Sequence, residues 1–121
     1  MGLHEEIDTA VGAHGLWKSR LRHAVATRRT DVPPEVVRAD DRCKFGQWLH
    51  RAVGPAERTG SSFRTVRDLH AQFHREAAKV LDLALAGRTA EAEAAMAPAS
   101  AFTEVSTQLT AAMMAWKRTS P

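Results

Sequence analysis

Apolar residues recur at helical spacing along most of this chain, and this pattern limits the fold more than any other feature. In residues 63–84 they return every three or four positions, as on one face of an α-helix. The positions of this stripe are Phe63, Val66, His70, Phe73, His74, Ala77, Val80, Leu81 and Ala84. The chain also has no tyrosine, whereas strands favour β-branched and aromatic residues. We therefore expect an all-α protein.

Four segments carry this periodicity. The expected helices are 5–28, 41–53, 61–86 and 89–117. Asp40 or Asp41 is suited to cap the second helix, and a serine of the Ser61-Ser62 pair to cap the third. Pro98 lies inside the fourth, where it removes a backbone donor, so we expect that helix to be kinked or broken near 95–97. Three long helices and one short helix in a single domain, residues 1–121, indicate an antiparallel helical bundle.

Composition and charge exclude several classes of protein. The net charge is only +3, and the basic residues are scattered among acidic ones, so we expect no nucleic-acid partner. No apolar run approaches the roughly 20 residues of a membrane-spanning helix, and the first residues do not resemble a signal peptide. A single cysteine, Cys43, fits a reducing compartment. We expect a cytoplasmic protein without membrane insertion.

Three of the six histidines lie within apolar stripes, where an imidazole without partners is costly. His70 and His74 are four residues apart, so their rings stand on the same face of one helix. His14 lies in the stripe of the first helix, and Cys43 lies in the first turn of the short helix. Three imidazole nitrogens and one thiolate suit tetrahedral Zn²⁺. This set predicts a closed structural or sensory site rather than an open catalytic one.

Simpler interpretations of the same residues remain open at this point. A His-x-x-x-His pair alone is a weak signal, because a helical histidine more often bonds a carbonyl or a carboxylate. A lone cysteine is usually a small buried hydrophobic residue. The aromatic residues Trp17, Phe45 and Phe73 are core residues first. Spacing alone leaves the metal site and the ordinary core about equally supported.

Three motifs, in order, resemble the chemoreceptor zinc-binding domain family. They are His14-Gly15-Leu16-Trp17-Lys18, Cys43-Lys44-Phe45-Gly46-Gln47-Trp48-Leu49 and His70-Ala71-Gln72-Phe73-His74. They follow the family pattern His-x-x-Trp-Lys, Cys-x-Phe/Leu-Gly-x-Trp and His-x-x-x-His. The resemblance covers about residues 5–86 by motif, and no ligand position of the pattern is missing.

The resemblance implies a helical bundle that binds one Zn²⁺ through His14, Cys43, His70 and His74. It implies a regulatory module of bacterial signalling, including chemotaxis. Because a zinc-bound thiolate is electron-rich and can be oxidised, we expect the module to respond to zinc or to oxidation of that cysteine. It further implies a homodimer with a bacterial signalling partner, and the apolar Met113, Met114 and Trp116 near the chain end favour a dimer as well. Gly46 is implied as a point of close backbone approach and Trp48 as a core anchor. No chemoreceptor or cyclase segment accompanies these motifs, so the output pathway is open.

Other functions are weighed against this one. Zinc could be a purely structural staple in an interaction domain. An enzyme with Cys43 as nucleophile and a histidine base lacks a recognisable oxyanion loop and a third orienting residue. A di-iron bundle needs Glu-x-x-His pairs, but Arg67 and Ala71 stand three residues before His70 and His74. We therefore expect a regulatory zinc-binding protein and not an enzyme.

Overall fold

The structure, a computed structural model, describes residues 2–120 and is all-α, as expected. The expected single domain, residues 1–121, includes Met1 and Pro121, which lie outside this range. Within the described range the helices are α1 (Leu3–Gly15), α2 (Trp17–Thr27), α3 (Pro34–Arg38), α4 (Lys44–Arg51), α5 (Pro55–Arg58), α6 (Ser61–Leu85), α7 (Thr89–Ala94) and α8 (Ala101–Thr119). No helix in this range is both long enough and apolar enough to cross a membrane.

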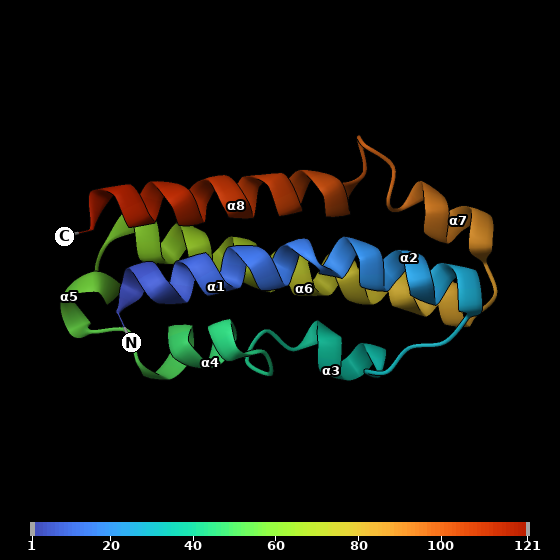
Figure 1. Ribbon diagram of the computed structural model, residues 1–121, viewed down its shortest axis with the longest axis horizontal. Helices are drawn as coiled ribbons and strands as arrows, with labels where there is room; N and C mark the ends of the chain where they lie inside the picture. The colour runs from blue at the N-terminus through green and yellow to red at the C-terminus, as the bar shows by residue number, and fades with distance from the viewer. Residues whose placement is uncertain (1, 121) are drawn as a thin grey trace.

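The long helix α6 is the centre of the molecule. It packs against α8, α3, α2 and α7, and ten of its residues are buried. In Figure 1, α1 and α2 follow one another along the length of α6. Helix α8 lies on one side of them, and the short helices α3 and α4 lie on the other. The core therefore runs along α6 and is closed by short elements on one flank.

The first expected helix, 5–28, is two helices. They meet at Leu16, whose backbone angles remain helical (φ −70°, ψ −19°). Hydrogen bonds continue across the junction, from Leu16 N to the Gly12 carbonyl (3.3 Å) and from Arg20 N to the Leu16 carbonyl (3.1 Å). Gly15, a poor helix former, precedes the junction. The interruption is therefore local, and the two helices still form one line.

The fourth expected helix, 89–117, is broken rather than kinked. Helix α7 ends at Ala94, and α8 begins at Ala101 after a segment that contains Pro98. The Ser100 hydroxyl accepts a hydrogen bond from the Thr103 backbone N–H and so starts a new helix. The backbone donor that is missing at Pro98 explains why α7 does not continue beyond this segment.

Prolines begin two short helices that the sequence analysis treated as connections. Pro34 is the first residue of α3 and Pro55 the first residue of α5. The first helical position needs no backbone N–H, so proline is favoured there. Each of these prolines therefore marks the start of a short helix.

The expected caps were also wrong. Cys43, not Asp40 or Asp41, stands at the N-cap of α4, which is shorter than the expected helix 41–53. Gly60, not a serine, precedes α6 without a side-chain cap. The sulfur of Cys43 takes the place of the expected aspartate oxygen as acceptor.

Candidate metal centre

Four side chains from three parts of the fold converge beside α6. His14 lies in the last turn of α1, Cys43 at the N-cap of α4, and His70 and His74 one turn apart on α6. Each offers one ligand atom, and these four atoms all lie within 4.8 Å of one another. In residues 2–120 this is the one such group of His, Cys, Asp or Glu. The structure thus brings together all four residues that the sequence singled out.

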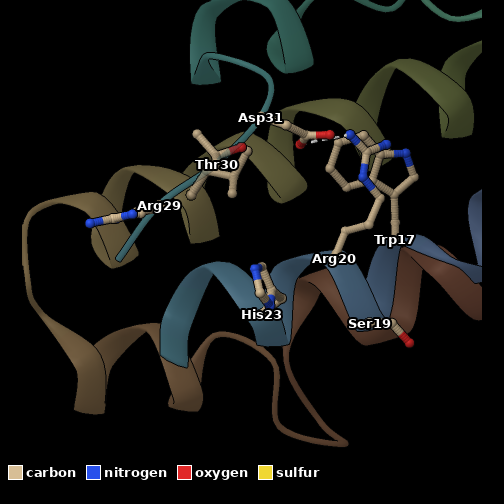
Figure 2. Close-up of a pocket in the computed structure, with 8 residues that line it drawn as sticks. Trp17, Ser19, Arg20, His23, Arg29, Thr30 and Asp31 are labelled. Carbon is tan, nitrogen blue, oxygen red and sulfur yellow. Dashed lines mark hydrogen bonds and ion pairs between the residues drawn. The ribbon is translucent and has the colours of Figure 1, made fainter. Parts of the chain in front are cut away.

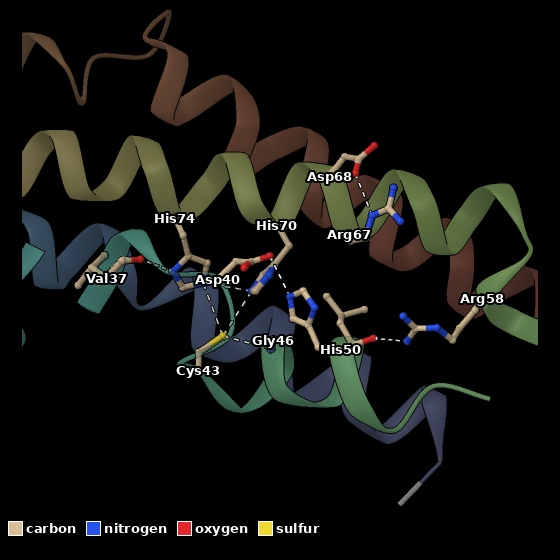
Figure 3. A network of polar contacts seen from close by, with 11 residues as sticks. Val37, Asp40, Cys43, Gly46, His50, Arg58, Arg67, Asp68, His70 and His74 are labelled. Atoms are coloured by element: carbon tan, nitrogen blue, oxygen red, sulfur yellow. Dashed lines mark hydrogen bonds and ion pairs between the residues drawn. The ribbon is translucent and has the colours of Figure 1, made fainter. Parts of the chain in front are cut away.

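The three distances among Cys43, His70 and His74 match the edges of a tetrahedral zinc site. Cys43 Sγ lies 3.3 Å from His70 Nε2 and 3.5 Å from His74 Nε2, and the two Nε2 atoms are 3.1 Å apart (Figure 3). Zn–N bonds of about 2.0–2.1 Å and a Zn–S bond of about 2.3 Å give N···N edges of about 3.3 Å and N···S edges of about 3.6 Å in a tetrahedron. The donor set and its spacing therefore suit zinc.

Backbone carbonyls orient two of the three imidazoles. His14 Nδ1 donates to the Ala10 carbonyl and His74 Nδ1 to the Val37 carbonyl, each at 2.8 Å. A carbonyl only accepts, so in both rings the proton is on Nδ1 and the lone pair is on Nε2. Metal-binding histidines are commonly held in this way. Both Nε2 atoms are therefore prepared to bind a cation.

Burial sets the charge of the site. Loss of hydration lowers the pKa of His14 to about 4 and that of His70 to about 2, and it also lowers the pKa of His74. All three rings are therefore neutral near pH 7. Burial raises the pKa of the Cys43 thiol, although the Gly46 N–H, which donates to Sγ, opposes this. A nearby divalent cation stabilises the thiolate and so reverses this balance.

The sequence model of the chemoreceptor zinc-binding domain matches residues 14–81, which is more than half of the chain and includes the whole group. The chain belongs to the chemoreceptor zinc-binding domain family. Zn²⁺ is the cofactor of this domain, and the protein is a zinc-binding module of the signalling type that the family name describes. Searches of the curated proteins and of the solved structures found no significant match.

The short helix of this zinc-binding domain approaches the preceding segment very closely at Gly46. A Cβ atom at this position would lie 1.7 Å from the Asp40 carbonyl oxygen. The same residue donates its backbone N–H to Cys43 Sγ at 3.3 Å. The close approach expected at Gly46 is thus confirmed, and it fixes the distance between Asp40 and the sulfur's helix.

Trp48 anchors α4 as expected, although it is only partly buried. Its ring stacks on Phe45, with ring centroids 5.6 Å apart, and lies 5.6 Å from the ring of Trp116 in α8. Phe45 in turn meets the rings of His14 and His70 edge-on. Aromatic contacts therefore connect the metal centre of the domain to the end of α8.

Solvent reaches the site along a groove between α1 and α4. The groove has a volume of about 630 Å³, and both His14 and Cys43 line it. His70 and His74, in contrast, are 0% and 2% exposed. Cys43, which is half-buried, is therefore the residue of the group most open to solvent.

A second hollow of about 560 Å³ lies over α2, and none of the four residues of the group lines it (Figure 2). The Arg20 guanidinium lies 4.0 Å above the ring of Trp17 and forms an ion pair of 3.2 Å with Asp31. His23, which the sequence analysis left outside the site, is part of this hollow. Arg20 and Asp31 already pair with each other, so we assign the hollow no role.

The sequence analysis missed the groups around the ligands. Asp40 was considered only as a helix cap, but its carboxyl group contacts His50 at 3.2 Å. No pattern in the sequence could have identified the Ala10 and Val37 carbonyls, because every residue carries one. For Asp40, the only sequence feature that could have suggested a place near the ligands was its position three residues before Cys43.

Proposed function

We propose that His14, Cys43, His70 and His74 bind one zinc ion per chain and that this site is the input of a regulatory module. The observation that carries the proposal is the convergence of four ligand atoms within 4.8 Å inside a zinc-binding domain. Bound zinc would hold Cys43 as a thiolate and join α1, α6 and the start of α4. The three neutral imidazoles supply the nitrogen ligands through Nε2.

We further propose that Cys43 is the part of the site that responds to the signal. It is half-buried and lines the groove, so it is the ligand most open to reagents. A two-electron oxidant such as hypochlorous acid can transfer oxygen to the thiolate, which yields the sulfenic acid and releases chloride. Loss of the thiolate, or of zinc itself at low supply, frees the start of α4.

The second candidate is a permanent structural staple. It is supported by the burial of His70 and His74 in the centre of the core, where a metal would stabilise the fold whether or not it signals. The two candidates differ in what happens to α4 when zinc leaves. Hydrogen exchange distinguishes them, as argued below for that helix.

Metal content tests the ligand assignment. We expect about one zinc per chain by elemental analysis of protein purified without added metal. Alanine at any one of the four proposed ligands should lower zinc affinity strongly. Alanine at His4, His23 or His50 provides matched controls, because His4 bonds the Ser120 carbonyl and His50 bonds Asp40. If His50→Ala removes zinc while His14→Ala does not, the assignment is wrong.

A further inference from the structure

One buried nitrogen at the metal centre has no hydrogen-bond partner. His70 is fully buried, and its Nδ1 atom is the one buried side-chain nitrogen or oxygen in residues 2–120 without a partner. The corresponding Nδ1 atoms of His14 and His74 each have a carbonyl at 2.8 Å. The three imidazoles are therefore not equivalent.

Zinc binding makes this difference important. A neutral imidazole carries its proton on one nitrogen only. In the metal-free chain His70 can keep that proton on Nε2, which lies 3.1 Å from His74 Nε2 and 3.3 Å from Cys43 Sγ. When Nε2 binds a metal, the proton has to be on Nδ1. Nδ1 then becomes a buried donor, and a buried donor needs an acceptor.

Asp40 is the acidic side chain best placed to accept a hydrogen bond from the His70 Nδ1–H group. Its side chain is only 25% exposed, and its Oδ2 atom contacts His50 Nε2 at 3.2 Å. In Figure 3 the Asp40 carboxyl group contacts the ring of His50 and overlaps the ring of His70 in this view. The contact of its backbone with Gly46 holds it beside the helix that carries the sulfur.

The charge of the same carboxylate acts on two of the proposed ligands. After the larger effect of burial, the charge of Asp40 contributes to the raised pKa of the Cys43 thiol. It also opposes the burial that lowers the pKa of His74. A carboxylate accepts several hydrogen bonds, so the contact through Oδ2 leaves Oδ1 available.

We propose that Asp40 is a positioning residue that accepts a hydrogen bond from His70 Nδ1–H when His70 binds zinc through Nε2. The inference rests on the proposed function. It gives His70 the partner that backbone carbonyls give the other two histidines. Partners of this kind fix the tautomer and the ring orientation, and their loss typically costs about 10- to 100-fold in metal affinity.

The test compares Asp40 with its neighbour in the full-length chain. Asp40→Ala removes the acceptor, whereas Asp40→Asn keeps an oxygen and removes the charge. Asp41→Ala removes an exposed carboxylate from the same segment and is the matched control. Zinc affinity is measured by competition with a chromogenic chelator, and long-range ¹H–¹⁵N NMR of the zinc-loaded wild type reports the His70 tautomer and the protection of its Nδ1 proton.

We expect Asp40→Ala to weaken zinc binding about 10- to 100-fold, while Asp40→Asn and Asp41→Ala stay within a few-fold of the wild type. The His50→Ala variant should bind zinc with wild-type affinity. This result would show that the role of Asp40 does not depend on its contact with His50. In the wild type, the His70 Nδ1 proton should exchange slowly, and Asp40→Ala should lose this protection. The proposed hydrogen bond would be contradicted if Asp40→Ala bound zinc with wild-type affinity. It would also be contradicted if Asp40→Asn and Asp40→Ala lost zinc affinity equally. A wild type that binds no zinc would instead reject the proposed function.

Discussion

At the scale of single residues, the metal centre depends on one position that has no side chain. Gly46 lets the Asp40 carbonyl approach α4, and its own N–H bonds Cys43 Sγ. Both neighbours are backbone or ligand atoms, so neither can turn aside as a flexible side chain could. The shape of the site is therefore sensitive to a methyl group here.

We predict that Gly46→Ala displaces the start of α4. A Cβ atom 1.7 Å from the Asp40 oxygen and 2.8 Å from the Asp40 carbonyl carbon forces the backbone apart. Unfolding free energy should fall by about 1–3 kcal/mol, and zinc affinity should fall at least about tenfold. Circular dichroism melts and chelator competition measure the two effects.

Gly12→Ala is the control for this substitution. A Cβ atom at Gly12 has no neighbour within 4 Å, and Gly12 lies in α1, close to His14. Alanine there should leave zinc affinity unchanged and raise stability by up to about 1 kcal/mol, because alanine favours helix. Equal behaviour of the two variants would show that the close approach has no importance for the site.

At the scale of helices, α4 is the short element that carries a proposed zinc ligand at its start. It has eight residues, fewer than the roughly 12–15 that an isolated helix needs in water. Phe45 and Leu49 attach it to the core, and Cys43 attaches its start to the α6 histidines. Helix α6, in contrast, is held by ten buried residues along its length.

We predict that zinc removal exposes α4 selectively. Hydrogen exchange followed by mass spectrometry should show faster exchange in 41–53 after chelation, while α6 and α8 keep their protection. A Cys43→Ser chain should show the same pattern when zinc is present. Loss of protection spread evenly over all helices would mean that zinc is a structural staple.

At the scale of the whole molecule, the apolar surface differs from what the sequence suggested. Met113 and Trp116, which favoured a dimer, are 0% and 1% exposed within a single chain. Trp116 also donates its indole N–H to Glu57. The large exposed apolar side chains in residues 2–120 are instead Leu16, 63% exposed, and Leu85, 40% exposed. Met113 and Trp116 therefore cannot provide a dimer surface, whereas Met114, the third residue of that group, is only half-buried.

We still propose a homodimer, as the family resemblance implies, and we predict that it forms through the α1–α2 junction. Leu16 is the most exposed large apolar side chain described and stands at that junction. Light scattering should give a dimer at micromolar concentration, and Leu16→Glu should shift it toward monomer, whereas Leu85→Glu should have little effect. A wild type that remains monomeric up to millimolar concentration would refute this.

The sequence by itself determined the features that depend on neighbours three or four residues apart. The apolar stripe of residues 63–84 predicted α6 nearly to its ends, and the spacing of His70 and His74 placed both rings on one face of it. The sequence also singled out His14 and Cys43 for the same group. Such periodicities are local, because they follow from the geometry of one helix.

Only the tertiary structure decided how distant residues meet. The Val37 carbonyl accepts a hydrogen bond from His74 and belongs to a short helix that begins at Pro34, in a segment that the sequence analysis left as a connection. Cys43 rather than an aspartate caps α4, which leaves the Asp40 carboxyl group to contact His50. These contacts depend on the packing of separate helices, and sequence periodicity carries no information about which carbonyl or carboxylate packing will bring to a given nitrogen.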